Sequence, residues 1–191
     1  MSIRHGLLTL LDQRPMYGYQ LRLEFEASTG STWPLNVGQV YTTLGRLERD
    51  GLVRAVDTAE EGQRTYAITD AGRAEVRAWF ATPVSRESPP RDELAIKLAL
   101  AVNAPGVDVP AVIQAQRTAT VEALQAYTRL KSASADGDLS WLLVVDSLIF
   151  AAEAEVRWLD HCETRLVRHR RPDRRPITGT ADVTGRQEAR R

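Results

Sequence analysis

The segment Asn36–Gly72 constrains the fold of this chain more than any other part of the sequence. Its first part repeats apolar residues at intervals of three and four positions, as a helix with one buried face does: Val37, Val40, Tyr41, Leu44 and Leu47. Gly51 then ends the helix, and two strand-like runs follow, Leu52–Val56 and Arg64–Ile68, with a polar turn that ends at Gly62. A helix followed at once by a β-hairpin is typical of a winged helix-turn-helix, and this pattern makes DNA binding the leading hypothesis.

The outward face of the same helix, for which Asn36 is the expected N-cap, is polar and basic. It carries Gln39, Thr42, Thr43, Arg46 and Arg49, with no carboxylate before Glu48 and Asp50. In the major groove glutamine pairs with adenine, arginine with guanine or a phosphate, and threonine with thymine methyls or phosphates. We therefore expect the first four of these residues to contact DNA, whereas an ion pair with a neighbour is equally natural for Arg49. The alternative for each side chain is a solvated helix face.

Three further residues near this helix are candidates for DNA contact. Arg54 and Arg64, on the two strands of the hairpin, fit a phosphate or the minor groove. Tyr41 can place its ring in the core and its hydroxyl on a phosphate. Glu60 and Glu61 oppose close approach to phosphate, so we expect the tip of the hairpin to point away from DNA or to bind it weakly. The zero net charge of the chain is compatible with DNA binding if a few arginines cluster on one face, because phosphate contacts depend on local charge. It does predict modest non-specific affinity for DNA.

The rest of the first half predicts three more helices, over Ile3–Gln13, Tyr17–Ser28 and Asp70–Ala81, the last with Thr69 as its N-cap. The inward residues are Ile3, Leu7, Leu10 and Leu11 in the first helix, Tyr17, Leu21 and Phe25 in the second, and Val76, Trp79 and Phe80 in the third. We expect a winged helix-turn-helix domain over residues 1–82 and a polar, proline-rich linker over 83–90.

The second half is predicted to be entirely helical, which makes the fold class mainly α with a small β-hairpin (α+β). An apolar helix spans about 91–102, and two longer helices span Val109–Lys131 and Leu139–His169. The last helix has a heptad pattern, formed by Leu142, Val145, Ile149, Ala152, Val156 and Leu159. Packing inside a monomer is one interpretation; a dimer interface is preferred, because recognition of two half-sites favours two-fold symmetry. We expect a helical dimerisation domain over 91–169 and an arginine-rich, disordered tail over 170–191.

Several short motifs are specific through their order and spacing. They are Tyr17-Gly18-Tyr19-Gln20-Leu21, Val40-Tyr41 with Leu44, Arg46-Leu47-Glu48, Asp50-Gly51-Leu52-Val53, Gly62 through Tyr66 with Thr69 and Gly72-Arg73, and, after the linker, Asp92-Glu93-Leu94 and Lys97-Leu98-Ala99-Leu100. In these motifs, over about Ile3 to His169, the sequence resembles the PadR family of bacterial transcriptional regulators. Many relatives have proline after the tyrosine of the recognition helix, where this chain has Thr42-Thr43, so no operator sequence can be transferred from a relative.

The resemblance implies a homodimeric repressor that binds double-stranded operator DNA and responds to a small aromatic or drug-like effector. Trp141 and Trp158 lie off the heptad seam of the last helix, where they can line an effector cavity, although structural packing is the preferred interpretation. Two other functions stay open. One is a small-molecule sensor whose main output is allosteric, and the other is a protein-interaction module that uses a winged helix without specific DNA binding.

The remaining residues argue against other classes of protein. His5, His161 and His169 are scattered, and Asp160-His161-Cys162-Glu163 distributes its side chains around a helix, which predicts neither a metal site nor a catalytic pair. The glycines form no phosphate-binding loop, so we expect no enzyme and no cofactor. The N-terminus has no signal-peptide pattern and no apolar run is long enough to span a membrane. Together with the single cysteine, Cys162, these features predict a cytoplasmic protein.

Overall fold

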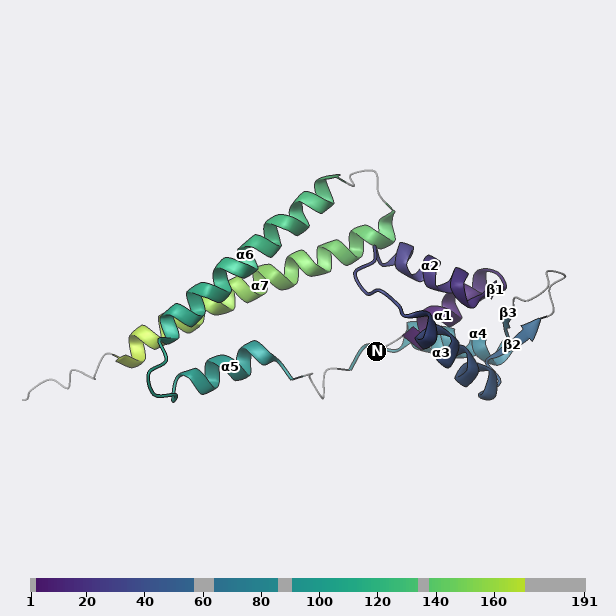
Figure 1. The fold of residues 1–191 in the computed structure, drawn as a ribbon, viewed down its shortest axis with the longest axis horizontal. Coiled ribbons are helices and arrows are strands. Elements are labelled where there is room, and N and C mark those ends of the chain that lie inside the picture. The colour runs from purple at the N-terminus through teal and green to yellow at the C-terminus, as the bar shows by residue number, and fades with distance from the viewer. Residues whose placement is uncertain (1–2, 57–63, 86–90, 134–137, 171–191) are drawn as a thin grey trace, which may run out of the picture.

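The computed structural model describes residues 3–56, 64–85, 91–133 and 138–170. In chain order the elements are α1 (Ile3–Gln13), β1 (Met16–Tyr17), α2 (Gly18–Ser28), α3 (Val37–Arg49), β2 (Val53–Val56), β3 (Thr65–Ile68), α4 (Asp70–Ala81), α5 (Glu93–Ala101), α6 (Val109–Ala133) and α7 (Leu139–Arg170). Figure 1 shows two halves, with α1 to α4 and the sheet at one end and the long α6–α7 hairpin with α5 at the other. The predicted fold class, mainly helical with a small sheet, is confirmed.

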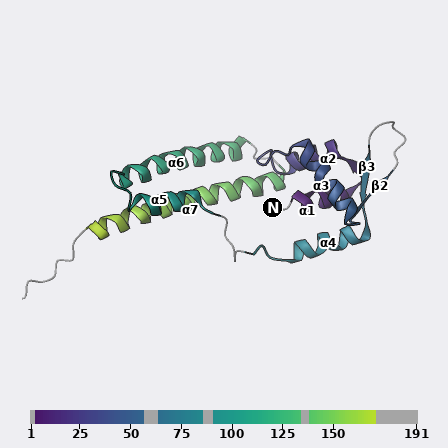
Figure 2. The same ribbon diagram turned by 60° about the horizontal axis from the view of Figure 1, so that its bottom comes forward.

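A leucine-rich core holds the N-terminal half together. The most deeply buried residues of its helices come from α1, α2 and α3 and are Leu7, Leu8, Leu11, Leu21, Val40, Leu44 and Leu47. Burial of one such side chain contributes about 1.5–3 kcal/mol, so these seven residues dominate the stability of this half. α4 adds Val76 to the same core, and Figure 2 shows that it packs on the opposite side of α1 from α2.

The sheet contains a strand that the sequence did not predict. β2 and β3 form the expected antiparallel hairpin, with Val53 opposite Ile68, and β1 adds to the other side of β3, with Met16 opposite Tyr66. β1 has two residues, too few for an alternating pattern to reveal it. Tyr17 is consequently the last residue of β1 and the N-cap of α2, which begins at Gly18 and not at Tyr17.

The ends of α3 are formed by the residues that the sequence singled out. The side-chain oxygen of Asn36 accepts a hydrogen bond from the backbone N–H of Gly38 at 2.8 Å, which confirms Asn36 as the N-cap. Gly51 follows the helix with φ of 71°, a left-handed conformation that glycine adopts without steric cost. The position at which the recognition helix enters and leaves the domain is therefore set locally.

The buried faces of two helices are narrower than predicted. Val37 and Tyr41 on α3 keep 38% and 44% of their surface exposed, and Phe80 on α4 keeps 65%, so the prediction that they face inward was wrong. Val37 and Phe80 lie at the ends of their helices, which extend past the leucine core, and Tyr41 lies on its rim. Leu8 on α1, which was not predicted to face inward, is fully buried.

The C-terminal half is an antiparallel hairpin of α6 and α7, against which α5 packs. Its small core contains Leu98 and Ala101 of α5, Val109 and Ile113 of α6, and Leu159 of α7. Between α6 and α7, Thr120 and Gln116 both donate hydrogen bonds to the carboxylate of Glu155, so these polar groups are satisfied inside the contact. None of the helices in the described ranges combines the length and the apolar character that a membrane span requires.

The predicted heptad seam on α7 is covered in part by the chain itself. Val145 and Leu159 are fully buried and Ala152 is 8% exposed within one chain, so their side chains are not available to a second copy in this arrangement. The other three residues of the seam, Leu142, Ile149 and Val156, are half-buried. The exposed apolar side chains of α7 include Leu139, Leu143 and Phe150, which lie on a different stripe of the helix.

Candidate DNA-binding surface

α3 presents one long face to solvent next to the hairpin. Its other face packs on α1 and α2, and β2 follows it in the chain and contacts it. Gln39, Thr42 and Arg46 are all exposed on the outer face. A helix that exposes such side chains at the edge of a small domain has the geometry to enter a major groove.

Two of the candidate residues also make hydrogen bonds within α3. The side-chain oxygen of Gln39 accepts from the backbone N–H of Asn36 at 3.4 Å, which completes a capping box. The hydroxyl of Thr43 donates to the carbonyl of Gln39 at 2.7 Å. To pair with adenine, Gln39 uses both the oxygen and the NH2 of its side-chain amide, so its oxygen has to leave the cap or accept a second hydrogen bond; Thr43 offers its methyl group and the lone pairs of its hydroxyl.

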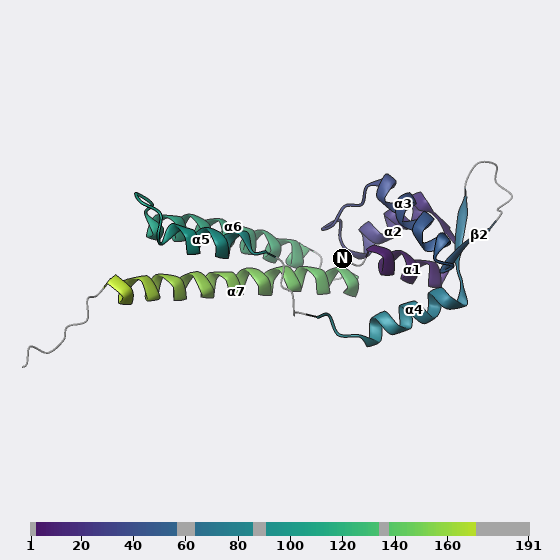
Figure 3. The ribbon, with the colours of Figure 1, turned by 90° about the horizontal axis from the view of Figure 1, so that it is seen from below.

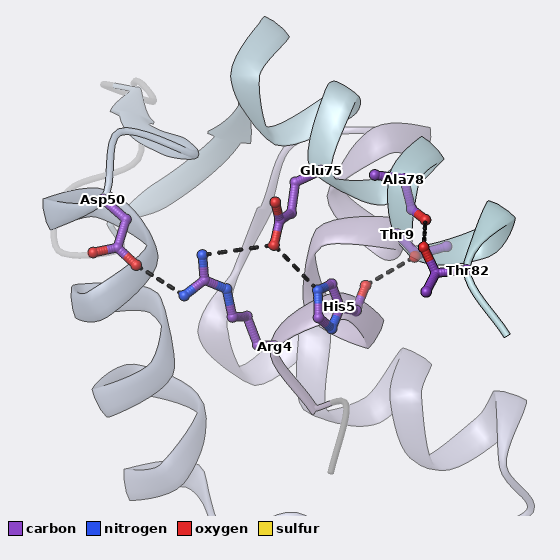
Figure 4. Close-up of polar contacts among 7 residues, drawn as sticks. All are labelled: Arg4, His5, Thr9, Asp50, Glu75, Ala78 and Thr82. Atoms are coloured by element: carbon purple, nitrogen blue, oxygen red, sulfur yellow. Dashed lines mark hydrogen bonds and ion pairs between the residues drawn. The ribbon is translucent and has the colours of Figure 1, made fainter. Parts of the chain in front are cut away.

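The acidic side chains at the end of α3 are paired with arginines from elsewhere in the chain, whereas the arginines of α3 itself are not paired within the described residues. Glu48 pairs with Arg64 at 2.7 Å, and Asp50 pairs with Arg4 at 2.9 Å. Figure 4 shows Arg4 reaching from α1 between Asp50 and Glu75. Within the residues that the structure describes, the exposed Arg46 and Arg49 form no ion pair. The acids of α3 are therefore neutralised and its arginines are not, so this face is locally positive although the chain is neutral overall.

The two hairpin arginines differ from one another. Arg54 is exposed on β2, whereas Arg64, just before β3, is held by Glu48 and lies 5.5 Å from the ring centre of Tyr66. Arg64 must leave or share Glu48 to reach a phosphate, so Arg54 is the more available of the two. The predicted acidic tip with Glu60 and Glu61 lies outside the described residues.

Tyr41 lies on the rim between α3 and α2. A Cβ atom at Gly18 would come within 2.7 Å of the Tyr41 ring, so the ring rests directly on the backbone where α2 begins. This close approach explains the glycine between Tyr17 and Tyr19. The ring contacts the start of α2 on one side, and Tyr41 keeps 44% of its surface exposed.

Sequence reasoning missed two features of this surface. Arg4, which neutralises Asp50, is 46 positions away in the sequence, and no local pattern indicates such a pair. Gly45 lies in the middle of α3 on its exposed side, and a Cβ atom there would meet nothing within 4 Å. The one sequence signal for Gly45 is that a glycine inside an expected helix needs an explanation.

Trp141 and Trp158, the two tryptophans of α7 that could line an effector cavity, lie in different parts of the structure. Trp141 packs on Gly30, in the loop that leads into α3, and the φ of 56° at Gly30 together with this contact excludes any larger residue there. Trp158 lies almost five turns further along α7, among α5 and α6. Trp141 is thus a direct contact between the C-terminal hairpin and the helix-turn-helix.

The histidines do not form a common site. His5 stacks on Trp79 with ring centres 5.2 Å apart and contacts Glu75 at 3.3 Å, whereas His161 and His169 lie on α7 in the other half. In the part of the chain that the structure describes, no group of three or more His, Cys, Asp or Glu residues is placed to hold a metal ion.

Comparisons with known proteins cover both halves of the chain. Residues 7–78 match the transcriptional regulator PadR-like family, and residues 90–167 match the virulence activator alpha C-terminal family. A probable transcriptional regulator of Mycobacterium tuberculosis, Rv1176c, is 31% identical over 185 residues, which are 87% of this chain and 98% of the relative.

Solved structures share the fold over most of the chain. The Vibrio cholerae virulence activator AphA is 25% identical with a TM-score of 0.64, over 87% of this chain and 98% of AphA. Bacillus subtilis PadR in complex with operator DNA is 17% identical with a TM-score of 0.66, and its complex with p-coumaric acid is 18% identical with a TM-score of 0.68. Each PadR comparison covers 87% of this chain and 99% of the PadR chain.

Proposed function

The chain belongs to the PadR-like family of transcriptional regulators, and from this premise we propose that it is a dimeric, ligand-responsive repressor that reads an operator through α3. The observation that carries the proposal is the outward face of α3, where Arg46 and Arg49 form no ion pair with any described residue, while Glu48 and the adjoining Asp50 are paired. The Bacillus subtilis PadR that shares this fold is bound to operator DNA, which supports the same partner for this chain.

Within this proposal each candidate residue has a role. Gln39 and Arg46 read base edges, and Thr42 and Thr43 contact thymine methyls or phosphates. Tyr41, Arg54 and Arg64 contact the phosphate backbone and fix the register of α3 in the groove. Repression follows from occupancy, because a dimer on an operator excludes other proteins from the same DNA.

We propose the domain organisation that the sequence predicts: a DNA-binding domain over residues 1–82, a linker over 83–90, a dimerisation domain over 91–169 and a tail over 170–191. The exposed apolar side chains of α5 and α7, among them Leu100, Leu143 and Phe150, supply a surface that a second copy would cover. A dimer places two copies of α3 on one side of the duplex, as two half-sites require.

An effector that changes the spacing of these two helices costs operator affinity by linkage. The PadR complex with p-coumaric acid supports such a response in this fold. Trp141 can transmit such a change from the C-terminal hairpin to α3, since it contacts Gly30 in the loop before α3.

Selection of bound fragments from the sheared DNA of the source organism tests the proposal. We expect enrichment of a few fragments that share a sequence with two related half-sites, and binding that weakens as salt is added. Uniform recovery of all fragments, or no binding even at low salt, would contradict it. The second outcome would favour the alternative of a protein-interaction module.

A further inference from the structure

A pocket of about 790 Å³ lies in the C-terminal half, where α5, α6 and the last part of α7 meet. Its described lining residues belong to these three helices, apart from Val102, which directly follows α5; Figures 1 and 3 show α5 beside the α6–α7 hairpin, remote from α3. Ala95 and Ala99 line it from α5, and their short side chains leave space that longer ones would fill. The pocket is therefore separate from the DNA-binding surface.

The inner wall of the pocket is apolar. Leu98 and Ile113 are buried there, and the half-buried Trp158 adds an aromatic surface. A wall of this kind accepts a hydrocarbon or aromatic body but gives it no preferred orientation. Orientation has to come from polar groups at the rim.

The rim is basic and comes from consecutive turns of α7. It is formed by His161, Arg165, Arg168 and His169, all of them exposed, and neither Asp nor Glu is among the lining residues that the structure describes. Arg165 donates its Nε–H to Nε2 of His161 at 2.9 Å. This bond holds the guanidinium in place, while its terminal N–H groups have no partner among the described residues.

The acids nearest to the rim are already neutralised. Asp160 and Glu163 both pair with Arg117 of α6, at 2.8 and 2.7 Å. Burial raises the pKa of the Cys162 thiol, although the nearby Arg165 opposes this effect, so the thiol stays neutral at neutral pH. No negative charge on the pocket side of α7 therefore offsets Arg165 and Arg168.

We propose that this pocket binds an amphipathic organic anion, with its apolar body on Leu98, Ile113 and Trp158 and its acidic head group on Arg165. An arginine with free terminal N–H groups suits a carboxylate, which it binds through two parallel hydrogen bonds. The regulatory meaning of this ligand rests on the proposed function, but the binding itself does not involve DNA.

Calorimetric titration of the full chain without DNA tests the pocket, with decanoate as the probe and decanol as its uncharged match. We expect saturable binding of decanoate and at least about tenfold weaker binding of decanol, because only the carboxylate reaches Arg165. Arg165→Gln should remove this preference. Arg157→Gln is the control, since Arg157 is exposed on the same helix but does not line the pocket.

Equal affinities for decanoate and decanol would overturn the proposal, as would equal losses in Arg165→Gln and Arg157→Gln. Ala99→Trp should fill the pocket and abolish decanoate binding without a change in oligomeric state by light scattering. A change in oligomeric state in that variant would mean that the pocket is an interface between copies and would also overturn it. If the wild-type chain binds decanoate as expected but no operator, the proposed repressor function fails and the pocket stands.

Discussion

At the scale of single residues, the recognition helix depends on which charges have partners. Glu48 and Asp50, at the end of α3, are each paired with an arginine distant in the sequence, whereas Arg46 and Arg49 of α3 are not paired in the described structure. Exposed ion pairs of this kind add only about 0–1 kcal/mol to folding stability. Their larger effect is on the electrostatic potential of α3, because they remove the acids that would repel phosphate.

Arg46→Ala should weaken specific operator binding by about 1–3 kcal/mol, because it removes a contact to guanine or phosphate from the centre of α3. Fluorescence anisotropy with a labelled operator measures this loss. Arg129→Ala, which removes another exposed arginine from α6 in the C-terminal half, should have no effect. Unchanged operator footprints in the Arg46 variant would remove Arg46 from the DNA-binding surface.

At the scale of helices and strands, the sequence predicts elements whose signals are local. α1 and α4 have the predicted bounds because Arg14-Pro15 and Thr69 mark their ends, and Asn36 and Gly51 do the same for α3. β1 was missed because its two residues become a strand only through pairing with β3. Long-range partners such as Arg4 for Asp50 leave no trace in a local pattern.

The candidate DNA-binding surface could be predicted in part for the same reason. Helical periodicity places Gln39, Thr42 and Arg46 on the outer face of α3, and the structure has them exposed. Periodicity alone could not separate the core from its rim, so Val37 and Tyr41 were assigned to the interior. It also could not reveal that Arg64 is engaged by Glu48.

Replacing two helical glycines by alanine distinguishes the effect of helix propensity on stability from the effect of packing. Gly45→Ala should raise the free energy of unfolding by about 0.5–1 kcal/mol, because the new methyl group meets nothing and the unfolded chain loses freedom. Gly72→Ala should instead lower it by about 1–3 kcal/mol, since its Cβ would collide with the backbone oxygen of Leu52. Urea denaturation at one fixed protein concentration measures both changes. A gain in stability for Gly72→Ala would show that α4 can shift away from Leu52 at little cost.

At the scale of the whole molecule, two phenylalanines with the same exposure test the proposed dimer. Phe150 on α7 and Phe80 on α4 are each 65% exposed, but only Phe150 lies on the proposed dimer surface. Phe150→Asp should produce monomers by light scattering and a large loss of operator affinity, because two half-sites are no longer bound together. Phe80→Asp should remain a dimer. Dimers in both variants would place the interface elsewhere on the chain.

The contact between Trp141 and Gly30 decides how firmly the two halves are joined. Figure 1 shows the start of α7 next to the end of α2, and the ring of Trp141 fills the space above Gly30 in the loop before α3. Without this ring, the helix-turn-helix is less well fixed relative to the C-terminal hairpin. Operator binding must then restrict motion that the wild-type contact already restricts.

Trp141→Ala should therefore weaken operator binding by about 1 kcal/mol and speed hydrogen exchange in the loop over residues 29–36. Trp158→Ala, which changes the same residue type on the same helix but away from α2, should alter neither quantity in the absence of effector. Wild-type affinity and unchanged exchange in Trp141→Ala would mean that the ring only fills space. The spacing of the two α3 helices would then have to be set by the dimer interface alone.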